Sequence, residues 1–64
     1  MVKINGELLD VTGKTVAEYL CTAGYDLKRI AVELNGDILP KSQYESYVLK
    51  GEDSVEIVSF MGGG

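Results

Sequence analysis

Two Asn-Gly pairs, at residues 5–6 and 35–36, constrain the fold of this chain more than any other feature. Each pair separates two short segments in which apolar and polar residues alternate. Asparagine and glycine tolerate the positive φ angles of a two-residue turn, so each pair predicts a β-hairpin. The four strands expected are residues 2–5, 7–11, 30–34 and 37–39, and Pro40 closes the last of them.

A single amphipathic helix is predicted between the hairpins, at residues 15–24. Thr15 and Glu18 have the spacing of a capping box, and Gly24 stands where a helix ends. Its apolar face is expected to carry Val16, Tyr19, Leu20 and Ala23. A helix of under three turns is unstable alone, so we expect this one to pack against the sheet.

The last strand is predicted at residues 55–60, where Val55 and Ile57 point one way and Glu56, Val58 and Phe60 the other. The segment 41–50 before it has no regular pattern. We expect four of its residues to form a short turn that closes one end of the core: Tyr44, Tyr47, Val48 and Leu49. The predicted core comprises Ile4, Val16, Leu20, Val32, Leu34, Val55 and Ile57, with Leu9, Val11 and Ile30 also facing inward.

The order of these elements favours one fold. A single helix covers only one face of a sheet, and the first and last strands can lie parallel at its centre with the helix in the crossover. This is the ubiquitin-like β-grasp of the α+β class, a five-stranded mixed sheet with one main helix. We expect residues 1–61 to form this domain and residues 62–64, three consecutive glycines, to form a flexible tail.

Composition excludes several functions. The 64 residues include one cysteine, Cys21, and no histidine, which excludes an internal disulfide and a self-contained hydrolytic triad and makes a metal site improbable. A net charge of -4 repels phosphate backbones and argues against a nucleic-acid partner. Since no apolar run reaches the roughly 20 residues needed to span a bilayer, we expect a soluble, cytoplasmic chain that is monomeric when free.

Several stretches together resemble the ThiS family of sulfur carriers of thiamine biosynthesis, over essentially the whole chain. They are "TVAEYL" in the helix, "IAVELNGDILPKSQY" in the second hairpin, "GEDSVEIV" in the last strand, and the terminal "GGG". The terminal glycines alone are a weak signal, because many ubiquitin-like proteins end in them. Combined with "ELNGDILPKSQ" and the chain length, they become specific.

This resemblance implies a cycle that other proteins perform on the carrier. A ThiF-like adenylyltransferase, similar to ubiquitin-activating enzymes, would activate the Gly64 carboxylate with ATP and Mg²⁺. A persulfide donor would convert it to a thiocarboxylate, and thiazole synthase would take the sulfur. The chain itself would be no enzyme and would bind no cofactor. Gly62 and Gly63 would thread the partner's slot, since residues without a Cβ pass a narrow opening.

Val58, Phe60 and Met61 are the expected partner-binding residues, because apolar and aromatic anchors on an exposed strand face favour interfaces. The alternative is that the segment 41–50 covers Val58 and Phe60. Cys21 lies on the helix and is expected to be a bystander rather than a sulfur relay. Acidic residues such as Glu52, Asp53 and Glu56 are expected to form a solvated surface, with acidic docking to basic partners as the alternative.

Two other functions stay open at this point. The chain could carry sulfur for molybdopterin or amino-acid synthesis, because the final acceptor is determined by the partners. It could also be a ubiquitin-like interaction module that never reacts, in which case the tail would be dispensable.

Overall fold

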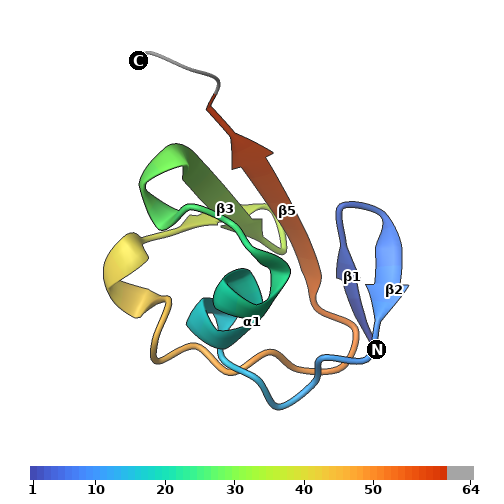
Figure 1. Cartoon of the computed structure of the whole chain (residues 1–64). Helices are drawn as coiled ribbons and strands as arrows, with labels where there is room; N and C mark the ends of the chain where they lie inside the picture. The colour runs from blue at the N-terminus through green and yellow to red at the C-terminus, as the bar shows by residue number, and fades with distance from the viewer. Residues whose placement is uncertain (61–64) are drawn as a thin grey trace.

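The computed structural model describes residues 1–60, and its centre is strand β5 of a five-stranded mixed sheet (Figure 1). The strands are β1 (Val2–Ile4), β2 (Glu7–Leu9), β3 (Ile30–Leu34), β4 (Asp37–Leu39) and β5 (Ser54–Ser59). Their order across the sheet is β2-β1-β5-β3-β4. β5 runs parallel to β1 and antiparallel to β3, and both hairpins are antiparallel. The predicted β-grasp fold is confirmed.

Both hairpins turn on the Asn-Gly pairs that the sequence indicates. Asn5 and Gly6 have φ angles of 51° and 85°, and Asn35 and Gly36 have φ angles of 52° and 91°. Two consecutive positive φ angles define the turn whose twist matches that of the flanking strands.

The single α-helix, α1 (Val16–Ala23), begins with the predicted capping box. The Glu18 N–H donates to the Thr15 hydroxyl at 3.1 Å, and the Thr15 N–H donates to the Glu18 carboxylate at 2.8 Å. Gly24 ends the helix at a φ of 85°. The prediction that Ala23 faces the core is wrong, because Ala23 lies exposed in the last turn of a helix that buries only Val16 and Leu20.

One apolar core lies between α1 and the sheet. Its buried residues are Val2, Ile4, Val16, Leu20, Ile30, Val32, Leu39, Tyr44, Leu49, Val55 and Ile57. Six of the seven predicted core residues are among them. Leu34 is only half-buried, since it ends β3 at the rim, where it packs against the cluster.

The segment 41–50 closes one end of this core, as predicted. It begins with a 3₁₀ helix, η2 (Lys41–Gln43), and buries Tyr44 and Leu49 while Val48 stays exposed. Backbone carbonyls of Tyr44 and Tyr47 accept hydrogen bonds from the first turn of α1, so the segment also fixes where the helix starts. Among residues 1–60, no helix is long and apolar enough to cross a membrane.

Candidate functional site

Strand β5 carries the chain out of the middle of the sheet towards the C-terminal glycines (Figure 1). It is hydrogen-bonded on both sides, to β1 and to β3. Within residues 1–60, the backbone hydrogen bond nearest the C-terminus is the one that the Phe60 N–H donates to the Arg29 carbonyl at 2.6 Å. The polypeptide is therefore held on the sheet up to Phe60.

The asparagines of the two turns hold β5 as well, through their side chains. The Asn5 amide oxygen accepts from the Ile57 N–H at 2.7 Å, and the Asn35 amide oxygen accepts from the Ser54 N–H at 2.8 Å. One clamp lies on each side of the strand, because Asn5 follows β1 and Asn35 follows β3. These side chains satisfy backbone groups that no neighbouring strand pairs.

Asp53 lies at the start of β5, and the expectation that it belongs to a solvated surface is wrong. Its side chain is 7% exposed. The carboxylate accepts hydrogen bonds from the Asn35 amide at 3.0 Å, the Tyr47 hydroxyl at 2.8 Å and the Lys50 N–H at 2.9 Å. Burial alone would raise the pKa of Asp53, but these donors outweigh it and lower the pKa below its ordinary value. The buried Asp53 side chain thus links the turn at Asn35 to the start of β5, and we call this link the Asp53 tie.

The outer face of the sheet, opposite α1, exposes an apolar surface that we call the outer patch. It comprises Leu8, Ile38, Val58 and Phe60. Val58 is 49% and Phe60 56% exposed, which excludes the alternative that the segment 41–50 covers them. Glu33 and Glu56 lie within this face, opposite each other on β3 and β5. Lys3 lies in the same face, between Leu8 on β2 and Ser54 on β5. The apolar side chains of the outer patch are therefore interspersed with charged ones.

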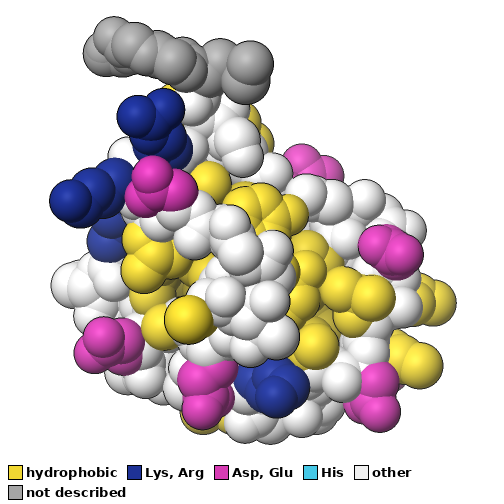
Figure 2. Space-filling model, viewed as in Figure 1, with side chains coloured by type: hydrophobic (Ala, Val, Ile, Leu, Met, Phe, Trp, Pro, Cys, Tyr) yellow, Lys and Arg dark blue, Asp and Glu magenta, His cyan; other side chains and the backbone are white. Residues whose placement is uncertain are grey.

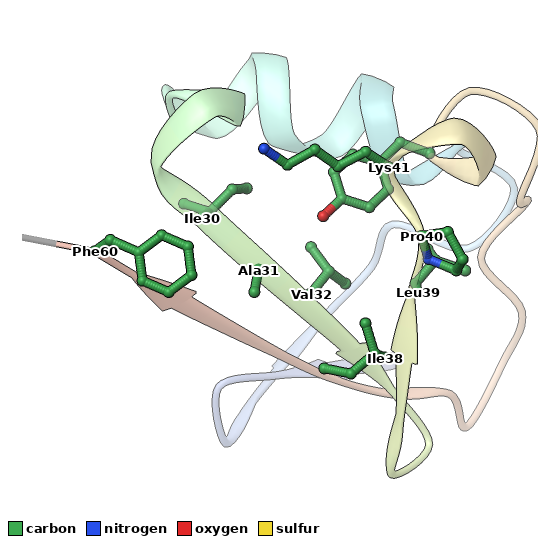
Figure 3. A pocket seen from close by; sticks show the side chains of 9 residues that line it. Ile30, Ala31, Val32, Ile38, Leu39, Pro40, Lys41 and Phe60 are labelled. Atoms are coloured by element: carbon green, nitrogen blue, oxygen red, sulfur yellow. The ribbon is translucent and has the colours of Figure 1, made fainter. Parts of the chain in front are cut away.

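A shallow apolar pocket of about 230 Å³ opens beside Phe60, at the edge of the sheet. In Figure 3 the Phe60 ring and Ile38 border opposite ends of the pocket, with Ala31 between them. The Lys41 side chain extends along the border of the pocket on the side of α1 in this view. The pocket lies where β4 has ended at Leu39 while β3 continues back to Ile30. It therefore extends the outer patch around the sheet edge.

Charged groups are unevenly distributed near this site. Lys28 and Arg29 directly precede β3, and Lys41 lines the pocket. Figure 2 shows several dark blue Lys and Arg side chains at the end of the molecule where β3 begins and β5 ends, with an acidic side chain beside them, and a further dark blue side chain on the opposite side. Arg29 is partly neutralised by Asp26, whose carboxylate lies 3.5 Å from the guanidinium. Basic side chains thus lie beside the end of β5.

The structure thus brings together two of the predicted site residues, Val58 and Phe60. Met61, Gly62, Gly63 and Gly64 lie outside the described residues. Cys21 is exposed on α1, and residues 1–60 hold no cluster of metal-ligating side chains. The two asparagine clamps and the Asp53 tie were not predicted, because the Asn-Gly signal indicates a turn without indicating what the side chain reaches.

Comparisons with known proteins identify related chains over nearly the full length. The family model of the ThiS family matches residues 2–64. The sulfur carrier protein ThiS of Thermus thermophilus is 39% identical, with all of both chains covered. The crystal structure of the thiamine biosynthesis protein (ThiS) from Geobacter metallireducens superposes with a TM-score of 0.78 at 31% identity, covering 98% of this chain and 97% of that one.

A further relative is much longer than this chain. The thiazole synthase of Paramagnetospirillum magneticum is 42% identical over 62 residues, which are 95% of this chain. The chain spans only 19% of the length of that protein.

Proposed function

Because this chain belongs to the ThiS family, we propose that it carries sulfur for thiazole formation in thiamine biosynthesis. The observation that carries the proposal is the match over the entire length of a protein named as a sulfur carrier, in a chain that ends in three glycines. The chain is the substrate of partner enzymes and no enzyme itself. The covalent chemistry takes place on the Gly64 carboxylate.

The chemistry begins with activation of that carboxylate. An α-carboxyl group has a pKa of about 3.5, so at neutral pH Gly64 ends in an anion that a sulfur nucleophile does not attack. Attack of the carboxylate on the α-phosphorus of ATP releases pyrophosphate and gives an acyl adenylate. The terminal sulfur of a donor persulfide then displaces AMP and gives an acyl disulfide with the donor. A second thiol of the partner proteins attacks the donor sulfur of that S–S bond, which releases the thiocarboxylate and leaves the two partner thiols as a disulfide. ATP and Mg²⁺ belong to the activating enzyme, where the metal offsets phosphate charge.

A glycine tail suits transfer between enzymes. Gly62 and Gly63 have no Cβ, so a partner can enclose their backbone tightly. Four extended residues after Phe60 reach roughly 13 Å, at about 3.3 Å per residue. This length is enough to enter a recessed site while the folded domain docks outside it.

The docking surface we propose is the outer patch around Val58 and Phe60, together with Met61. An exposed aromatic side chain next to the exit of the tail is the type of anchor that contributes most at interfaces. The same surface serves a ThiF-like adenylyltransferase and thiazole synthase in turn, since one tail leaves the domain beside it. Support for the second partner comes from the relative named thiazole synthase, which contains a region similar to this chain.

ATP–pyrophosphate exchange with the adenylyltransferase from the same source tests this function. Full-length carrier should support exchange, and a variant lacking Gly64 should not. The deletion moves the carboxylate by roughly one residue length, about 3.3 Å. A displacement of about 1 Å already costs on the order of a hundredfold in rate.

The matched control is Cys21→Ser, which removes the only side-chain thiol and should leave exchange and sulfur loading unchanged. Undiminished exchange by the Gly64 deletion would falsify the carrier mechanism and favour a non-reacting interaction module. Loss of sulfur loading in Cys21→Ser would move the chemistry to the thiol.

A further inference from the structure

The two Asn-Gly turns combine a structural role with a chemical liability. Each asparagine side chain holds β5, and each is followed by a glycine whose backbone nitrogen is unhindered. Asn-Gly is the dipeptide at which asparagine deamidates most readily, for that steric reason. We propose that Asn35 is a spontaneous modification site, at which deamidation to aspartate breaks the tie between the second hairpin and the start of β5.

The reaction needs water and no other reagent. The Gly36 backbone nitrogen attacks Cγ of Asn35, forming a C–N bond. The bond from Cγ to Nδ2 breaks, and Nδ2 leaves as ammonia with the proton from the attacking nitrogen. Water then opens the five-membered succinimide and gives aspartate or isoaspartate. The net change is one water consumed and one ammonia released.

The surroundings of Asn35 make this change costly. Its Nδ2 donates to the Asp53 carboxylate at 3.0 Å, and deamidation replaces that donor with a carboxylate oxygen. Two carboxylates would then face each other, and one of them, Asp53, is only 7% exposed. Like charges at such a distance do not both ionise without a cost. The Ser54 N–H, by contrast, would still find an oxygen on residue 35.

Asn5 provides an internal comparison. Its Oδ1 accepts the strong hydrogen bond from Ile57 at 2.7 Å, while its Nδ2 donates to the Ile57 carbonyl at only 3.4 Å. Aspartate at position 5 keeps the oxygen that makes the short bond, and among the described contacts of Asn5 no carboxylate faces it. The same chemistry at two identical dipeptides should therefore have unequal consequences.

The fold also sets the order in which the two sites react. Attack requires the asparagine side chain to leave its hydrogen bonds and rotate towards the following nitrogen. At Asn35 this breaks a charge-assisted bond to Asp53 that has no counterpart at Asn5. Charge-assisted bonds are about twice as strong as neutral ones, so we expect Asn35 to react about tenfold more slowly than Asn5 in the folded chain. In the unfolded chain the difference should vanish.

The consequence is a limit on the working life of the folded domain. Each molecule that converts Asn35 loses the hydrogen bond that ties the second hairpin to the start of β5. Aspartate formed at position 5 keeps the oxygen that accepts from the Ile57 N–H, so the clamp on that side of β5 remains. This inference is independent of the proposed function, since it concerns only contacts within residues 1–60.

Peptide mapping by mass spectrometry tests the order of reaction. The purified full-length protein is incubated at mildly alkaline pH, folded or in concentrated urea, and aspartate and isoaspartate are quantified at both positions over time. We expect faster conversion at Asn5 in the folded protein and equal rates in urea. Equal rates in the folded protein would overturn the protective role of Asp53.

Defined variants test the consequence. Asn35→Asp should lower the denaturant midpoint clearly, whereas Asn5→Asp should stay near wild type. The decisive variant exchanges the two groups, Asn35→Asp with Asp53→Asn. The amide then at position 53 can donate to the carboxylate at position 35 while its oxygen accepts from Tyr47 and Lys50, so each contact can be remade. Recovery of most of the lost stability supports the proposal, also when the single variant does not fold. A stable Asn35→Asp, or no recovery in the exchange, overturns it.

Discussion

Glu33 and Glu56 lie directly opposite each other on β3 and β5, in the outer face of the sheet. Like charges in this cross-strand position are destabilising. The pair therefore lowers the stability of a small domain at the centre of the surface proposed for docking. A basic group of the partner would relieve the repulsion on binding, which adds to the acidic-docking alternative considered from the sequence.

Replacing one of these carboxylates should stabilise the free protein. In Glu56→Lys the opposed like charges become an opposite pair, and we expect a gain of about 0.2 to 1 kcal/mol in the free energy of unfolding. Urea denaturation measures it. Glu45→Lys makes the same change in charge at an exposed position of the segment 41–50 and should leave the midpoint nearly unchanged. An equal gain in both variants would mean that net charge, rather than the pair, is responsible.

Truncation in the core should be severe. Leu20 is completely buried between α1 and the sheet, and Leu20→Ala should cost about 2 to 5 kcal/mol. Leu8→Ala removes the same atoms from a side chain that is 65% exposed and should change stability by at most about 0.5 kcal/mol. Thermal or urea melts of the two variants give the comparison. Similar losses in both would contradict the assignment of the two faces.

Protonation of Asp53 should make the free energy of unfolding depend on pH in the acidic range. Its pKa is lowered in the folded state, so the unfolded chain takes up the proton at a higher pH than the folded chain. The stabilisation is thus complete above the ordinary aspartate pKa of about 3.9 and is lost as the pH falls through the lower, folded value.

The variant Asp53→Asn isolates this contribution. The amide oxygen at position 53 can still accept from Tyr47 and Lys50, but the new NH2 group faces the Asn35 amide donor, which loses its acceptor. A loss of about 1 to 3 kcal/mol in the free energy of unfolding is therefore expected at neutral pH. The difference from wild type should shrink as the pH falls below about 4. Urea titrations at a series of pH values measure it. A difference that stayed constant with pH would show that the carboxylate charge is irrelevant.

Phe60 should matter for partner binding and little for folding. Phe60→Asp places a charge on an exposed ring next to the exit of the tail, and we expect at least tenfold weaker binding to the adenylyltransferase with an unchanged unfolding midpoint. Val48→Asp adds the same charge to an exposed residue that pairs with Thr15 at the start of α1, and it should bind normally. Calorimetric titration of both variants decides. Normal binding by Phe60→Asp would exclude the outer patch as the docking surface.

The sequence was informative wherever a local pattern determines the structure. The positive φ angles of Asn5 and Asn35, the capping box of Thr15 and Glu18, and the alternation along β5 all act within a few residues. Their combination is enough to specify the β-grasp.

Contacts between distant residues were not predictable in this way. The sequence around Asp53 is typical of a surface turn. Its carboxylate is buried because Asn35, eighteen positions away, donates to it together with Tyr47 and Lys50. The clamp from Asn5 reaches across 52 positions to Ile57. The prediction for Ala23 was wrong for a related reason. A helical pattern indicates which residues share a face, but it does not indicate how far along the helix that face is covered.

We propose that the working group of this chain is the carboxylate of Gly64. Intact-mass and fragmentation spectra of the protein isolated from its own cells test it most directly. We expect a population in which one oxygen is replaced by sulfur, with the added mass confined to the C-terminal fragment that contains Gly64. That population should be absent from Gly64-deleted protein and retained in Cys21→Ser. Added sulfur located on Cys21, or an unmodified C-terminus in cells that are making thiamine, would contradict it.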